Sequence, residues 1–280
     1  MADPPLTEGQ RWSRELLADL RAERYGPEAW AELIARSLKR ARATGRERRA
    51  LARQARSWGL AGVAATFLAA SRGGPKRRRA LAWWGLCWAM LEWHLGMVEG
   101  PAGERRLRLG PGDALTLARA GMVPFVATPA GRSSWIATVA AAAATDLADG
   151  PLARRGGETR LGRDLDACTD VAFFSAAALG AVRAGWISAG AGLTLQARHL
   201  GGLVLIAWHW FARGVPPRVV YGAARWSGAP SALGLVLGRP AGAGRQAGLL
   251  LTVTSAVAAA AHAVALGHYG GRRGRADAGA

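Results

Sequence analysis

Two pairs of aspartates stand out between residues 146 and 170 of the chain. Asp146 and Asp149 are three residues apart and close an Ala-rich apolar run. Asp166 and Asp170 are four residues apart and open the next apolar run. Residues three or four apart lie on the same face of a helix. The spacing therefore predicts that each of two successive helices presents a pair of carboxylates on one face.

Carboxylates gathered beside apolar segments point to a bound cation. They would repel one another and raise each other's pKa values unless a positive charge lay between them. Oxygen ligands suit a hard divalent ion, and two such ions about 3.5–4 Å apart could bridge the carboxylates and a substrate diphosphate. An EF-hand is excluded because the stretch lacks the alternating ligand order and the terminal Glu of that loop. We expect Mg²⁺ or Mn²⁺, as two ions, on Asp146, Asp149, Asp166 and Asp170.

The surroundings of the aspartates favour a function over a stabilising role. Asp146 and Asp149 are expected at a helix C-terminus, where the macrodipole disfavours anions by roughly a few tenths of a kcal/mol each. Small residues nearby would let a ligand approach the backbone, and an arginine could hold a phosphate. These residues are Gly150, Ala153, Gly162 and Arg154.

All of these positions together form one specific pattern. It reads Asp146-x2-Asp149-Gly150-x2-Ala153-Arg154-x7-Gly162-x3-Asp166-x3-Asp170. The pattern resembles the signature of the CDP-alcohol phosphotransferase (CDP-alcohol phosphatidyltransferase) family of integral membrane enzymes. A lone pair of aspartates would carry no such weight. The interval between Arg154 and Gly162 is one residue shorter than is usual in the family, and the weaker resemblance extends from about Pro111 to about His268.

The resemblance implies roles for individual residues. The principal metal ligands would be Asp146, Asp149 and Asp166. Asp170 would both bind metal and act as the general base that activates an acceptor hydroxyl. By the family pattern, small residues would lie beneath the cytidine, with Arg154 and Thr159 on phosphates. The residues that would line the CDP site are Gly150, Ala153, Arg154, Thr159 and Gly162.

A second, weaker likeness lies further upstream. Asp113-x2-Thr116-x2-Arg119 resembles the opening of the family's first core helix, commonly Asn-x-Leu-Thr-x-x-Arg, with Asp113 where Asn is usual. Thr116 and Arg119 thereby gain a role near the nucleotide or acceptor phosphate, although Arg119 could equally snorkel toward headgroups. Arg198, within a later apolar run, is a further candidate for the polar cavity.

Composition and apolar runs indicate a membrane protein. The chain has 280 residues, 50% of them hydrophobic, and a net charge of +18. Nucleic acid is not expected as a partner, because much of the Arg lies between apolar segments, where anionic headgroups and the positive-inside rule explain it. We expect an all-α, polytopic membrane bundle of about six core transmembrane helices. The expected spans are 114–130, 132–148, 166–184, 187–211, 219–238 and 248–267, with 219–238 alternatively a loop.

Residues 1–100 are expected to form an N-terminal region of basic amphipathic and interfacial helices, followed by a membrane domain over 101–280. Apolar residues recur at helical spacing around Trp12 and Trp30. The Arg-rich segment 36–56 fits either a solvated helix face or a helix on anionic lipid. The segment 58–70 is too short to span and is read as interfacial or re-entrant, and 81–98 could span or lie flat.

The resemblance implies metal-dependent transfer of a phosphatidyl group from CDP-diacylglycerol, or a related CDP-alcohol, to a small alcohol or polyol phosphate, with release of CMP. Val171 stands where glycerol-phosphate enzymes often carry Lys and inositol-phosphate enzymes Arg, so neither acceptor is indicated. Two alternatives remain: a variant that joins two soluble polyol phosphates, and a non-catalytic, lipid-binding scaffold. The basic connector at Arg154, Arg155, Arg160 and Arg163 predicts an active site facing the cytoplasm, in a bacterial cytoplasmic membrane. Membrane lipids are expected partners, and a homodimer remains open.

Overall fold

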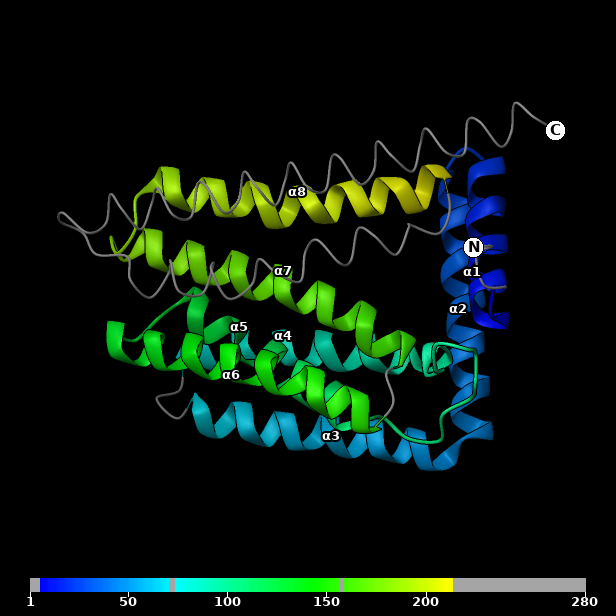
Figure 1. The fold of residues 1–280 in the computed structure, drawn as a ribbon, viewed down its shortest axis with the longest axis horizontal. Coiled ribbons are helices and arrows are strands. Elements are labelled where there is room, and N and C mark those ends of the chain that lie inside the picture. Colours follow the sequence, from blue (N-terminus) through cyan, green and yellow to red (C-terminus); the bar gives the residue numbers. More distant parts are fainter. Residues whose placement is uncertain (1–5, 71–73, 157–158, 214–280) are drawn as a thin grey trace. The chain divides into compact units, whose positions relative to one another are not determined.

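The structure, a computed structural model, describes residues 6–70, 74–156 and 159–213. Regular secondary structure in these ranges is helical (Figure 1). The elements are α1 (Glu8–Ala22), α2 (Pro27–Glu47), α3 (Arg49–Ala69), α4 (Gly74–Trp93), the 3₁₀ helix η1 (Leu95–Met97), α5 (Pro111–Ala127), α6 (Arg132–Gly156), α7 (Arg160–Arg183) and α8 (Ala189–Arg213). One isolated β-bridge, Glu99 with Arg105, occurs in the same ranges. The all-α prediction is confirmed for this part of the chain.

The chain divides into two compact units. Unit 1 comprises Met1–Thr128 and Ala144–Thr169, and unit 2 comprises Pro129–Ala143 and Asp170–Ala280. Helices α6 and α7 each run from one unit into the other. The division at residue 100 that the sequence suggested stays a prediction.

The first N-terminal helix, α1, follows the predicted apolar periodicity, whereas α2 buries Ala29, Ala41 and Thr44 in place of the predicted apolar face. A capping box begins α1, because the Thr7 hydroxyl accepts the N–H of Gln10 and the Gln10 side chain accepts the N–H of Thr7. Helix α1 buries Leu16 and Leu20. Apolar side chains that α2 leaves exposed include Trp30 and Ile34.

Helices α3 and α4 pack against each other through tryptophans that lie over glycines. The Trp84 indole nitrogen donates to the carbonyl of Gly59 at 2.8 Å, and the Trp84 ring covers Gly62. A Cβ on either glycine would collide with a tryptophan ring, so glycine is required for this approach. The apolar segment 58–70 belongs mostly to α3, which begins at Arg49 and is 21 residues long, and its interfacial or re-entrant placement stays a prediction.

Helix α5 begins as the sequence suggests, with Pro111 in its first turn and the Asp113 carboxylate accepting the N–H of Gly110 at 2.7 Å. The predicted end of the next helix is wrong. Helix α6 continues past Asp146 and Asp149 to Gly156, so these aspartates do not lie at a C-terminus and the macrodipole argument falls away. Helix α7 already begins at Arg160, so only residues 157–159 separate α6 from α7.

Unit 2 contains most of α7 and all of α8. The rings of Phe174 and His199 stack at 4.8 Å between centroids, and the Gln196 amide donates to the carbonyl of Ser175 at 2.8 Å. By length and composition, one helix among those described, α7, is apolar enough to cross a membrane. The six-span bundle is therefore not confirmed, and the expected spans 219–238 and 248–267 lie outside the described residues.

Candidate metal and substrate site

Arg119 on α5 occupies the centre of a polar site in unit 1. Its side chain is 2% exposed, so it does not snorkel to the surface. Its guanidinium donates one hydrogen bond to Asp146 Oδ1 on α6 at 3.3 Å and another to Asp166 Oδ1 on α7. Burying an unpaired charge is costly, so a buried arginine needs such carboxylate partners. One fixed cation thus joins a member of each aspartate pair.

The same two carboxylates belong to a cluster of three. Asp170 lies one turn further along α7 than Asp166. One oxygen from each of Asp146, Asp166 and Asp170 lies within 4.8 Å of the other two. Oxygens on opposite sides of one Mg²⁺ would be about 4.2 Å apart, because each Mg–O distance is about 2.1 Å. Three hard oxygen donors at this spacing fit a divalent cation after small side-chain adjustments.

The remaining residues predicted on α6 are placed by their backbone alone. Asp149, Gly150, Ala153 and Arg154 all lie in α6, and their side chains are outside what the structure describes. Because the helix is continuous here, positions 146, 149 and 153 share one face of α6. The helical backbone therefore carries three pattern positions in one line, which a loop after Ala148 would not do.

Thr159 and Gly162 form the start of α7. The Thr159 hydroxyl accepts the N–H of Gly162 at 2.8 Å, as an N-cap side chain does, and donates to Asp113 Oδ1 at 3.1 Å. Asp113 lies directly over Gly162, where any Cβ would collide with its carboxylate. Two of the five residues predicted to line the CDP site, Thr159 and Gly162, thus contact Asp113, which was not predicted as a site residue.

Two further candidates lie on α5 and α8. Thr116 is buried, one turn before Arg119. In unit 2, Arg198 lies close enough to Asp170 for an attractive electrostatic interaction. Its neighbour His199 stacks on Phe174, which suits packing.

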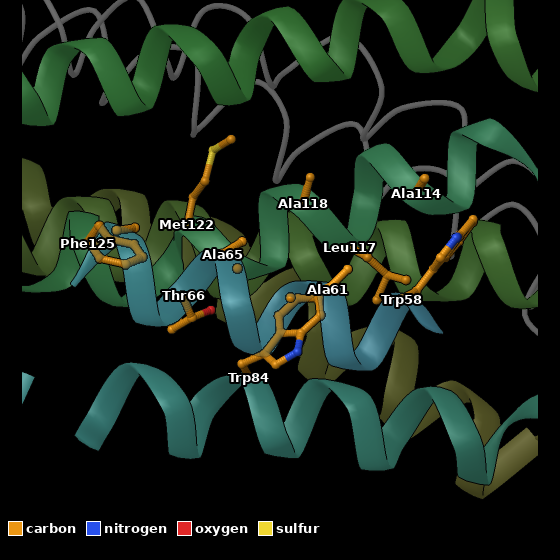
Figure 2. Close-up of a pocket in the computed structure, with 13 residues that line it drawn as sticks. Trp58, Ala61, Ala65, Thr66, Trp84, Ala114, Leu117, Ala118, Met122 and Phe125 are labelled. Atoms are coloured by element: carbon orange, nitrogen blue, oxygen red, sulfur yellow. The ribbon is translucent and has the colours of Figure 1, made fainter. Parts of the chain in front are cut away.

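An apolar pocket of about 400 Å³ lies elsewhere in unit 1. It is lined by α3, by Trp84 of α4, and by the face of α5 that carries Leu117 and Phe125 (Figure 2). No lining residue is titratable, so the pocket does not suit a charged diphosphate. By helical spacing, its α5 face is opposite to the face that carries Arg119.

The sequence reasoning also missed Glu99. Glu99 and Arg160 form an ion pair at 3.2 Å in which each side chain is 7% exposed. No spacing rule connects these residues, because Glu99 precedes the pattern and Arg160 was read as part of a basic connector.

Comparison with known proteins finds a family match over the stretch of chain that contains the aspartate pattern. The family model for CDP-alcohol phosphatidyltransferase matches residues 112–267, more than half of the chain. Searches of curated proteins and of solved structures gave no match.

Asp146, Asp166 and Asp170 all lie within the matched residues. Members of the matched family are typically membrane-integral transferases that use divalent metals. The chain belongs to the CDP-alcohol phosphatidyltransferase family. The resemblance stated from the aspartate pattern is therefore confirmed, and membership supports transfer of a phosphatidyl group from a CDP-alcohol.

Proposed function

We propose that the protein transfers a phosphatidyl group from CDP-diacylglycerol to the hydroxyl of a small alcohol or polyol phosphate and releases CMP. The observation that carries this proposal is the grouping of Asp146, Asp166 and Asp170 oxygens within 4.8 Å. Family membership supplies the reaction class, and the acid cluster supplies a place for it in this chain.

The aspartates would hold Mg²⁺ or Mn²⁺, as one or two ions. Asp146 and Asp166 are supported by their grouping, and Asp149 by its place on the same face of α6. When bound, the ions would neutralise the diphosphate and the CMP leaving group.

Asp170 is proposed as the general base. It would take the proton of the acceptor hydroxyl while that oxygen forms a bond to the phosphatidyl phosphorus. The bond between this phosphorus and the CMP oxygen breaks, and CMP leaves with the bonding electron pair. Arg198 lies close enough to Asp170 for an attractive electrostatic interaction with its carboxylate.

The CDP moiety is proposed to lie along the first turns of α7 and the facing positions of α6. Gly150, Ala153 and Arg154 would contact it from α6, with Arg154 on a phosphate. Thr159 would act mainly by capping α7 and holding Asp113 over Gly162, because its hydroxyl already makes both of those bonds.

Arg119 is proposed to keep the acid cluster assembled before the cations bind. Its two hydrogen bonds join the same carboxylates that the cations would use. The basic residues between the two aspartate pairs, Arg154, Arg155, Arg160 and Arg163, support placement of the site on the cytoplasmic face of the membrane.

The test is CMP release by purified protein in mixed micelles of CDP-diacylglycerol. A panel of glycerol, inositol, serine and their phosphates is offered with Mg²⁺ or Mn²⁺, and the product is extracted into organic solvent. Metal-dependent CMP release with a lipid-soluble product supports the proposal. A product that stays in water would instead identify a transferase for soluble alcohols, and no CMP release with any acceptor would favour the non-catalytic scaffold.

A further inference from the structure

A buried ion pair fixes the first residue of α7. Arg160 Nη1 donates to Glu99 Oε1 at 3.2 Å, and both side chains are 7% exposed. The backbone N–H of Arg160 also donates to the carbonyl oxygen of Glu99 at 2.8 Å. The two residues are therefore joined through both main chain and side chain, which holds α7 at a set position relative to the segment before α5.

Helix α1 completes this contact. Arg160 Nη2 donates to Ser13 Oγ at 2.7 Å, and the hydroxyl of the N-cap residue Thr7 donates to Glu99 Oε1 at 3.2 Å. Gly9 leaves room for the Glu99 carboxylate, since a Cβ there would lie 2.7 Å from Oε2. The carboxylate also lies at the N-terminus of α1, where the helix dipole favours an anion.

Stability alone is a poor account of this arrangement. The cost of desolvating two charges often exceeds their attraction, so a buried ion pair adds little net stability over apolar residues of the same size. Charged hydrogen bonds do impose a fixed direction on both partners, especially through the planar guanidinium. The arrangement is thus better suited to positioning than to strengthening the fold.

What it positions is the start of the candidate site. Thr159 immediately precedes Arg160, and Gly162 and Asp166 follow in the first two turns of α7. A shift of this helix start would displace Gly162 from Asp113 and Asp166 from Arg119. Displacement of catalytic groups by about 1 Å can lower a rate by about 100-fold.

We propose that Glu99, Arg160 and helix α1 form a clamp by which the N-terminal helices position the substrate- and metal-binding start of α7. The clamp is defined by Thr7, Gly9, Ser13, Glu99 and Arg160. Four of these residues precede the part of the chain that matches the family, so the reaction of this protein depends on a region added outside the family domain. Only the expected changes in KM and kcat/KM rest on the proposed function; the positioning of α7 by the clamp does not.

Gly9→Ala tests the clamp with little direct cost to the fold. The new methyl group meets the mobile end of a side chain, so Glu99 can move aside, and alanine is the better helix residue. That movement breaks the bonds from Arg160 and Thr7. The matched control is Gly45→Ala in α2, where a Cβ meets only an ordinary contact at 3.7 Å.

Glu99→Gln and Arg160→Lys test the charges directly. Gln keeps the shape of Glu99 but not its charge. Lys keeps the charge of Arg160, but its single amino group cannot replace the two guanidinium nitrogens that bind Glu99 and Ser13. Glu47→Gln is the control, because Glu47 pairs with Arg105 at 2.8 Å in an exposed position of the same region.

We expect Gly9→Ala, Glu99→Gln and Arg160→Lys to raise KM for CDP-diacylglycerol and the Mn²⁺ dissociation constant, with kcat/KM lower by about 10- to 100-fold. Hydrogen exchange of the amides of residues 159–166 should become faster, a readout that requires no turnover. Both controls should match the wild type. Gly9→Ala should add nothing in a Glu99→Ala background, because the carboxylate that it displaces is gone.

Unchanged exchange and unchanged Mn²⁺ binding in the three variants would overturn the clamp. So would lower thermal stability with unaltered KM and metal affinity, since a purely structural role reduces only the amount of folded enzyme. If the wild type released no CMP but exchange and Mn²⁺ binding changed as stated, the clamp would stand and the proposed reaction would be the part that failed.

Discussion

Arg119 donates a hydrogen bond to Asp166, although 47 residues separate them in the sequence. With its second bond to Asp146, the 2% exposed guanidinium supplies positive charge to a cluster of acids that would otherwise repel one another. A divalent cation would bind the same carboxylates, so Arg119 and the metal ion would both reduce the repulsion between them.

Replacing this arginine should make stability depend on metal. Arg119→Gln removes the buried cation, and breaking a buried pair costs about 3 kcal/mol. Thermal unfolding in detergent should show a large loss of stability without metal and a smaller one with Mn²⁺, because the ion substitutes for the missing charge. Arg36→Gln, which breaks an exposed pair with Asp19 at 2.8 Å, should change stability by about 1 kcal/mol or less. If Arg119→Gln lost the same stability with and without Mn²⁺, the ion would not substitute for the arginine charge and the account would be contradicted.

Asp170→Asn should separate catalysis from folding. The isosteric amide cannot accept the acceptor's proton, so CMP release should fall by about 100-fold or more while the protein stays folded. Steady-state CMP release and thermal unfolding measure the two properties. Asp164→Asn is the control, because Asp164 lies on the same helix and forms an ion pair with its neighbour Arg163 at 3.7 Å. Turnover unchanged by Asp170→Asn would remove Asp170 from the mechanism.

Gly162→Ala should disturb the start of α7. The added methyl group would collide with the Asp113 carboxylate and lie 2.9 Å from Thr159 Oγ1. Overpacking of this kind costs about 1–3 kcal/mol, which thermal unfolding would detect. Gly190→Ala in α8, where no atom lies within 4 Å of the new Cβ, should be neutral or slightly stabilising.

The cause of that loss can be isolated by a double mutant. If the collision with Asp113 is responsible, Gly162→Ala and Asp113→Ala together should cost less than the sum of the two single changes. Strict additivity would show that Asp113 does not impose glycine at position 162.

Local sequence rules predicted the parts of this site that depend on helical spacing. The intervals between Asp146 and Asp149 and between Asp166 and Asp170 indicated two helices with acids on one face, and oxygens from three of these residues do lie together. The end of α6 was predicted wrongly because the apolar run ends at Ala148, yet the helix continues through Gly150 and Pro151 to Gly156. A proline costs a helix one hydrogen bond, and the surrounding structure can outweigh that cost.

Long-range pairs could not be predicted from spacing. The bridge from Arg119 and the clamp between Glu99 and Arg160 join residues from helices and loops that are far apart in the sequence. In the sequence, Asp113 is only a departure from the usual Asn, and its bond from Thr159 joins residues that are 46 positions apart. The position of Arg119 within an apolar helix was a sequence signal of a buried acid partner.

The most direct test of the central claim is a titration of Mn²⁺ binding by electron paramagnetic resonance on wild type, Asp146→Asn and Asp166→Asn at equal amounts of folded protein. Because the two carboxylates come from different helices and share the cation, either change should weaken Mn²⁺ binding by at least about 10-fold, the loss that follows even when only a hydrogen-bond partner of a ligand is removed. Mg²⁺ should displace the bound Mn²⁺. Binding of equal strength in all three proteins would contradict a metal site built jointly by α6 and α7.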